Sequence, residues 1–150
     1  MFIVRKSDVF TYANMEAVMA KFEFTKDLET GNALIDSEHR ELLAAANKLM
    51  EACSSGKGRG QMAETVKFLN DYVERHFADE EKLQKQSGYP GYEGHRAFHE
   101  KYKQTLKEIT AGISDSGISI ADLARLNGHI GLLVTHIRTE DKKLGAFLSK

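Results

Sequence analysis

Most histidines in this sequence stand at helical spacing from another residue that can bind a metal. Residues four apart on a helix lie on one face, with about 5–6 Å between their Cβ atoms, so both side chains can reach one metal ion. The candidates are His39 alone, the pairs His76 with Glu80 and His95 with His99, which are four apart, and the pair His136 with Asp141, which are five apart. A zinc site takes about four ligands. Seven candidates are too many for such a site and instead predict two metals joined by bridging carboxylates.

The histidines and acids must be weighed against ordinary core positions. A single histidine on an apolar face is more often a hydrogen-bonded core residue than a ligand. Among the three acids at 79–81, only Glu80 stands four residues after His76. An acid on a buried stripe needs a cation or another partner to offset its desolvation. Five histidines on such stripes, together with Glu80, therefore favour metal binding.

The acid that accompanies His136 stays open on spacing alone. Glu140 follows at four residues and Asp141 at five. An ideal helix places the fifth residue about 140° away, which favours Glu140. Asp141 can reach the site only if the helix bulges or ends there, as π turns at functional sites do.

Four helix-length stretches carry these residues. They run from about Ser37 to Cys53, from about Gln61 to Gln86, from near Pro90, and from Ser119. Apolar residues recur within each stretch in steps of three and four, and the last one opens with a capping-box-like Ser119-x-x-Asp122. The pattern predicts an all-α, up-down-up-down four-helix bundle. In this arrangement the metal-type residues of all four helices meet at one end.

Three further residues on these stripes have more than one interpretation. His129 stands seven residues before His136, so it is either a second layer around the site, a pocket residue, or a buried histidine bonded to a neighbouring group. Tyr102 on the third helix is either a core residue or a hydrogen-bond donor in a pocket. Cys53 is expected to be a small buried apolar residue rather than a reactive thiol.

Composition limits the class of protein. The chain has 150 residues, which suits one domain, and a net charge of −1. Its Lys and Arg residues form no basic stripe, so we expect no nucleic-acid partner. No segment approaches the roughly 20 apolar residues of a membrane-spanning helix. With Cys53 as the single cysteine and no signal-peptide pattern, we expect a cytoplasmic protein without a membrane partner.

The ligand types narrow the choice of metal. Imidazole suits zinc, copper, iron and nickel, whereas bridging carboxylates suit pairs of iron or manganese. Ferritin-like di-iron proteins use Glu-x-x-His pairs and four or more carboxylates. This chain is richer in histidine and poorer in carboxylates, which indicates a different di-iron class.

At this point the sequence resembles the hemerythrin family, and within it the single-domain bacteriohemerythrins. The resemblance covers about Phe24 to Leu148. The segments that carry it are 27–31 (DLETG), 35–39 (IDSEH), 76–81 (HFADEE), 87–95 (SGYPGYEGH) with His99, and 136–143 (HIRTEDKK). Two positions depart from the family: Phe24 stands where tryptophan is usual, and His129 where an apolar residue is usual.

The resemblance implies a role for each candidate. It implies one iron held by His95, His99 and His136, and a second held by His39 and His76 with an open position. It also implies that Glu80 and Asp141 bridge the two ions, which selects Asp141 over Glu140; helix spacing did not make that choice.

The resemblance also implies a function, namely reversible binding of dioxygen at a non-haem di-iron centre by an oxygen carrier, store or deliverer. The alternatives are an oxygen or redox sensor that acts through an unidentified protein partner, or a di-iron enzyme for peroxide or nitric oxide; we expect no enzyme. Dioxygen needs an apolar, water-poor pocket. The expected wall residues flank the ligands: Leu42, Leu43, Phe77, Leu132 and Leu133.

The resemblance also divides the chain. Residues 1–20 form an N-terminal extension, and 21–150 form the bundle. The extension is either an ordered element on the bundle or an interface element; alternatively, translation starts at Met19 and the residues before it are not part of the protein.

Overall fold

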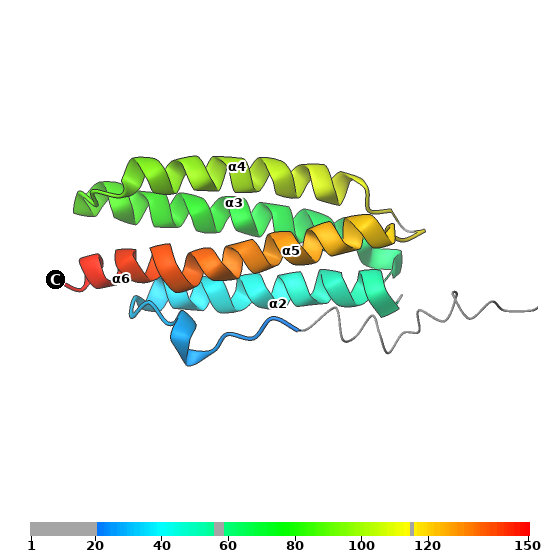
Figure 1. Ribbon diagram of the computed structural model, residues 1–150, viewed down its shortest axis with the longest axis horizontal. Helices are drawn as coiled ribbons and strands as arrows, with labels where there is room; N and C mark the ends of the chain where they lie inside the picture. The colour runs from blue at the N-terminus through cyan, green and yellow to red at the C-terminus, as the bar shows by residue number, and fades with distance from the viewer. Residues whose placement is uncertain (1–20, 56–58, 115) are drawn as a thin grey trace, which may run out of the picture.

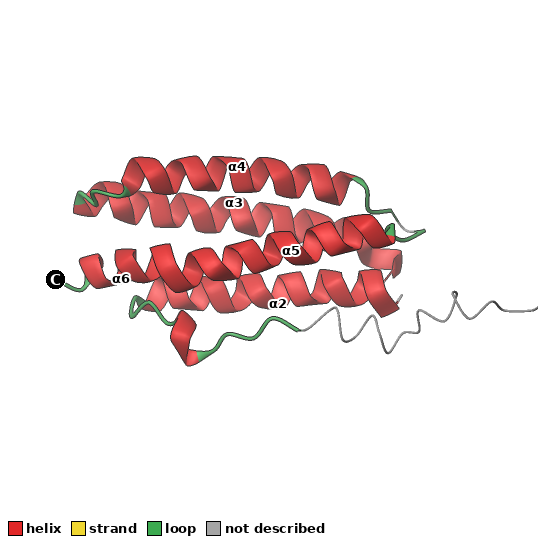
Figure 2. Ribbon diagram, in the orientation of Figure 1, coloured by secondary structure: helices red, strands yellow, loops and turns green. Residues whose placement is uncertain are grey.

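Four long antiparallel helices make up most of the structure (Figure 1). The computed structural model describes residues 21–55, 59–114 and 116–150. The helices are α2 (Ala33–Ser55), α3 (Met62–Ser87), α4 (Tyr92–Ala111) and α5 (Ile120–His136), with two short 3-10 turns, η1 (Lys26–Leu28) and η2 (Arg59–Gln61). Within the described residues there is no strand (Figure 2). This arrangement confirms the predicted four-helix bundle; the predicted extension, 1–20, lies outside the described residues.

The fourth helix is longer than the label α5 suggests. It continues through a π-helical turn, η3 (Ile137–Asp141), into α6 (Lys142–Leu148), and Figure 1 shows the three as one continuous rod. The start of α2, the end of α3, the start of α4 and this last rod segment all lie at the same end of the bundle (Figure 1). The helix ends that carry the metal-type residues therefore lie together, as the sequence predicted.

Local side-chain chemistry explains where the helices begin and end. The side chain of Asn32 accepts a hydrogen bond from the Ile35 N–H at 3.1 Å, so α2 starts four residues before the predicted Ser37. Ser119 caps α5 as predicted, because its Oγ accepts from the Asp122 N–H at 3.1 Å. Helix α3 ends at Gly88, whose φ of 68° is a left-handed conformation that glycine adopts without strain.

Apolar stripes of the four helices form one core. Its fully buried members include Leu42 and Leu49 of α2, Phe77 of α3, Leu106 of α4 and Leu126 of α5. Cys53 is buried at the edge of α2 in the same cluster, as predicted. None of the described helices combines the length and apolar character that a membrane crossing needs.

The segment before α2 is fastened to the bundle by specific contacts. Asp36, buried in the first turn of α2, accepts hydrogen bonds from the Thr30 N–H at 2.8 Å and the Thr30 hydroxyl at 2.7 Å. Phe24 is half-buried, and the guanidinium of Arg40 lies 4.4 Å from its ring centroid. These contacts hold the loop against the end of the bundle where the metal-type residues gather.

The same loop leaves no room beside Gly145 of α6. A Cβ at this position would overlap the backbone oxygen of Thr30, and a backbone atom cannot swing aside as a side chain can. We expect Gly145→Ala to lower the free energy of unfolding by about 1–3 kcal/mol, measured by urea denaturation. Gly128→Ala is the matched control: Gly128 lies exposed in α5 with open space around it, so alanine there should raise stability by up to about 1 kcal/mol. Equal effects at both sites would contradict the close approach.

Candidate metal centre

All seven candidate ligands come together in the interior of the bundle. Each is at most 5% exposed to solvent. Helix α2 contributes His39, α3 contributes His76 and Glu80, α4 contributes His95 and His99, α5 contributes His136, and η3 contributes Asp141. Their ligand atoms form two overlapping groups in which all atoms lie within 4.8 Å of one another. One group is Glu80, His95, His99 and His136, and the other is His39, His76, Glu80 and Asp141.

The two carboxylates divide their oxygens between these groups. Oε2 of Glu80 lies 3.1 Å from Nε2 of His76, whereas its Oε1 lies 3.2 Å from Nε2 of His95. Asp141 repeats the pattern, with Oδ2 at 3.1 Å from Nε2 of His39 and Oδ1 at 2.8 Å from Nε2 of His95. Two carboxylates that each face both histidine groups have the arrangement of bridging ligands.

The π turn explains how Asp141 reaches the cluster. In η3 the chain takes one extra residue per turn, so the fifth residue after His136 returns to the same face. Oδ1 of Asp141 lies 3.1 Å from Nε2 of His136. Glu140, the acid that regular helix spacing favours, instead points outward and pairs with Lys143 at 3.0 Å. The structure therefore contains the bulge that the sequence left as an open alternative.

Hydrogen bonds on the outer side of the rings orient three of the histidines. Nδ1 of His76 lies 2.7 Å from Glu38, Nδ1 of His99 lies 3.0 Å from Glu81, and Nδ1 of His95 lies 2.5 Å from the amide of Gln84. Partners of this kind fix the ring and the tautomer of a metal-binding histidine, which leaves Nε2 free for the metal. None of these three partners was predicted from the sequence. Only Gln84 carried a usable signal, because it stands four residues after Glu80 on the same stripe.

The inward-facing atoms fit a bound cation. Nε2 of His39, His76 and His99 and both oxygens of Glu80 are buried without a hydrogen-bond partner. Buried polar atoms left in this condition are costly, so they are normally satisfied by a partner. Metal ions held by the two groups would satisfy these atoms together, and an imidazole-rich set that shares two carboxylates suits iron.

The pKa values point to the same need for positive charge. Burial alone would lower the pKa of His76, yet the carboxylates of Glu38 and Glu80 beside the ring outweigh it and raise the pKa to about 10. Burial and the charge of Asp141 would raise the pKa of Glu80, but the neighbouring imidazoles of His76 and His99 hold it below its ordinary value. The pKa of Asp141 is also lowered, against its burial, by the three histidines that surround it, His136, His39 and His95. A metal cation can replace the protons that otherwise balance these carboxylates.

Aromatic rings stack on one cluster histidine of α4 and on one of α5. The ring of Phe77 stacks on His99 with centroids 3.8 Å apart, and Phe98 stacks on His136 at 3.9 Å. Phe77 was among the expected wall residues, whereas Phe98 was not.

The other expected wall residues are leucines. Leu42, Leu43 and Leu133 are buried in the core cluster. The expectation for Leu132 was wrong: it is 49% exposed, because it lies on the outer edge of α5, about 100° around the helix from Leu133.

Tyr102 and His129 tie α4 to α5 through each other's backbone. The Tyr102 hydroxyl donates to the carbonyl of His129 at 3.0 Å, and Nε2–H of His129 donates to the carbonyl of Tyr102 at 3.0 Å. Their rings stack with centroids 3.8 Å apart. These bonds match the alternative of a buried histidine bonded to a neighbouring carbonyl. Because Tyr102 also contacts Phe77 edge-on, the pair lies one ring beyond His99.

The buried position of His129 predicts a pH effect on stability. Desolvation lowers the pKa of His129 below its ordinary value of 6.5. His129 therefore takes up a proton less readily in the folded protein than in the unfolded chain. Its contribution to the free energy of unfolding should be fully present above pH 6.5 and should decline as the pH falls below it. His129→Gln keeps a donor for the carbonyl but cannot titrate. In urea unfolding at pH 7.5 and 5.5, the wild type should lose more stability than the variant; an equal loss would contradict the lowered pKa.

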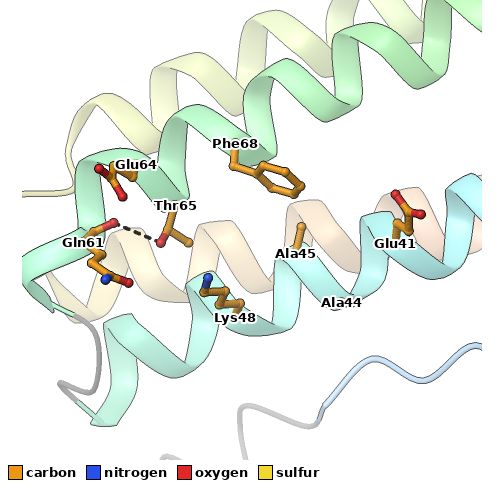
Figure 3. A pocket seen from close by; sticks show the side chains of 8 residues that line it. All are labelled: Glu41, Ala44, Ala45, Lys48, Gln61, Glu64, Thr65 and Phe68. Carbon is orange, nitrogen blue, oxygen red and sulfur yellow. Dashed lines mark hydrogen bonds between the residues drawn. The ribbon is translucent and has the colours of Figure 1, made fainter.

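A separate groove of about 500 Å³ lies between α2 and α3 (Figure 3). Ala45 and Lys48 line one side, and Thr65 and Phe68 line the other. Figure 3 shows these side chains around the hollow, with the Thr65 hydroxyl donating to the Gln61 carbonyl at 3.0 Å. None of the seven candidate ligands lines this groove. It is therefore not the metal centre.

Comparison with known proteins finds that this chain is similar to hemerythrins. The pattern of the family described as Hemerythrin HHE cation binding domain matches residues 30–148. Bacteriohemerythrin of Pseudomonas aeruginosa (strain LESB58) is 32% identical over 124 residues, covering 82% of this chain and 78% of the relative. Bacteriohemerythrin of Stenotrophomonas maltophilia (strain R551-3) is also 32% identical, covering 83% and 79%. Myohemerythrin of Theromyzon tessulatum is 28% identical, covering 81% and 89%.

Proposed function

This chain belongs to the hemerythrin family of di-iron, oxygen-binding proteins, and on that premise we propose that it binds dioxygen reversibly as a carrier, store or deliverer. The observation that carries the proposal is the division of the Glu80 and Asp141 oxygens between two groups of buried histidines. This arrangement supports two ions held close together. A centre of two irons is suited to reversible oxygen chemistry rather than to a purely structural role.

We assign the ligands in two unequal sets. His95, His99 and His136 would hold one iron, and His39 and His76 would hold the other. Glu80 and Asp141 would be shared between them. The set with three histidines is fuller than the set with two, so a small ligand would be taken up on the side of His39 and His76.

The chain's own residues contribute binding, orientation and exclusion of water. The iron pair, when bound, supplies the electrons that reversible dioxygen binding requires. Glu38 and Glu81 hold their histidines through Nδ1, so Nε2 stays aimed at the centre. Phe77 and Leu42 are about 1% exposed, and with Leu133 they form an apolar surround that limits access of water to the site.

Two finer predictions accompany this proposal. We propose that the protein is not an enzyme, since the ligand set is poor in the carboxylates that ferritin-like di-iron proteins use. We also propose a cytoplasmic location, because the single cysteine is buried and needs no oxidising compartment.

The experiment is an absorption spectrum of the iron-loaded, reduced protein before oxygen, after oxygen and after oxygen is removed. A charge-transfer band that appears and then disappears over repeated cycles is the expected result. A band that persists, or that gives way to an oxidised form on first exposure, would contradict the carrier proposal and favour a sensor or an enzyme. Absence of any band at two bound irons per chain would contradict oxygen binding itself.

A further inference from the structure

The cluster histidines differ in the charge of the group that holds them from outside. His76 and His99 face the carboxylates of Glu38 and Glu81, whereas His95 faces the neutral amide of Gln84. We propose that Gln84 is a positioning residue that fixes His95 by hydrogen bonding and, through its neutral amide, sets the reduction potential of the iron pair. This inference rests on the proposed di-iron function and adds a residue that adjusts the reduction potential of that centre.

The direction of the hydrogen bond follows from the atoms around the ring. Nε2 of His95 lies 2.8 Å from Oδ1 of Asp141 and 3.2 Å from Oε1 of Glu80, so this nitrogen faces the cluster. Nδ1 must then carry the hydrogen and donate it. The matching acceptor is Oε1 of Gln84, which is buried without a partner and exchanges places with the amide nitrogen by a half-turn of the amide. The pair is complete when Nδ1–H of His95 donates to Oε1.

Gln84 is well placed to hold His95 rigidly. Its side chain is fully buried, and its backbone carbonyl accepts the Tyr89 N–H at 2.9 Å in the turn that links α3 to α4. His95 lies in the first turn of α4, directly after this connection. The same residue therefore fixes the turn through its backbone and the ring through its amide.

The charge of the outer acceptor affects how strongly an imidazole binds iron. An acceptor on Nδ1–H raises the basicity of the ligand, and a charged acceptor makes a stronger hydrogen bond than a neutral one. A carboxylate at position 84 should therefore favour the ferric over the ferrous ion and lower the reduction potential. Each tenfold change in that relative affinity corresponds to about 59 mV for one electron.

The test compares four iron-loaded proteins: wild type, Gln84→Met, Gln84→Glu and the control Gln86→Met. Methionine keeps the length of glutamine but cannot accept the bond, and Gln86 is exposed two residues away on the same helix. We expect Gln84→Met to release iron to a chelator about 10- to 100-fold faster, in line with the affinity lost when such partners are removed. Gln84→Glu should keep the iron and titrate to a lower midpoint potential, and Gln86→Met should match the wild type.

Two results would overturn the inference. One is a Gln84→Met variant that releases iron at the wild-type rate and has the wild-type potential. The other is a Gln84→Glu variant whose reduction potential is unchanged. This second result tests the inference even if the methionine variant does not fold. The proposed function fails separately, in the wild type, if the iron-loaded protein gives no reversible oxygen band. A wild type that passes that test with unresponsive Gln84 variants contradicts only the role of Gln84.

Discussion

Glu80→Ala should reduce the iron content of the loaded protein from two ions per chain to at most one. The substitution removes oxygens that face both groups, 3.1 Å from His76 on one side and 3.2 Å from His95 on the other. Removing an outer partner of a ligand costs about 10- to 100-fold in metal affinity, and loss of a bridging ligand should cost more. The measurement is iron per chain after anaerobic loading and desalting, together with the absorption spectrum.

Asp79→Ala is the matched control for this substitution. Asp79 is the preceding residue on the same helix, but its side chain is 39% exposed and pairs with Arg75 at 3.8 Å. It should retain both irons and the oxygen-dependent band. Two irons per chain in Glu80→Ala, or an equal loss in both variants, would contradict the bridging role of Glu80.

Helical spacing was sufficient to predict the bundle and to select the candidate ligands other than Asp141. Residues four apart share a face whatever the neighbouring helices do, so the pairs His76 with Glu80 and His95 with His99 were visible in the sequence. The common end followed from alternating helix directions. The N-terminal start of α2 was placed too late because the capping role of Asn32 was overlooked, although asparagine is a favoured cap.

Contacts between helices could not be predicted in the same way. Whether Glu38 meets His76, or Phe98 stacks on His136, depends on the rotation of each helix and on side-chain rotamers. These depend on packing across the bundle rather than on spacing within one helix. Leu132 illustrates the limit: it stands four residues before His136, yet the core face of α5 is centred nearer Leu133, so Leu132 faces outward.

The π turn was the one local feature that spacing left undecided. A turn with an extra residue places a less regular hydrogen-bonding pattern in the helix, and no residue type in 137–141 specifies it. The family resemblance selected Asp141, and the structure supplies the bulge that brings it to His136. A regular helix would have presented Glu140 instead.

Asp141→Ala should lower iron content or retention sharply, whereas Glu140→Ala should leave both unchanged. Asp141 is 1% exposed and touches histidines of both groups, while the side chain of Glu140 is 49% exposed and contacts Lys143. Iron per chain and the rate of release to a chelator measure the difference between these adjacent acids. Iron loss in Glu140→Ala with retention in Asp141→Ala would mean that the helix is regular here and that the ligand assignment is wrong.

Deletion of Thr139 tests whether Asp141 needs the π turn itself or only a position on the same helix face as His136. Thr139 is exposed, and without it Asp141 would stand four residues after His136, where a regular helix points it to the same face. The residues of α6 would keep their facing, because the deletion removes the one extra residue that the π turn accommodates. We therefore expect the deletion variant to fold and to hold two irons. The variant could instead fold with normal helical content but lose the second iron. That result would show that the orientation of the Asp141 carboxylate depends on the π turn itself, and not only on a position on the face of His136.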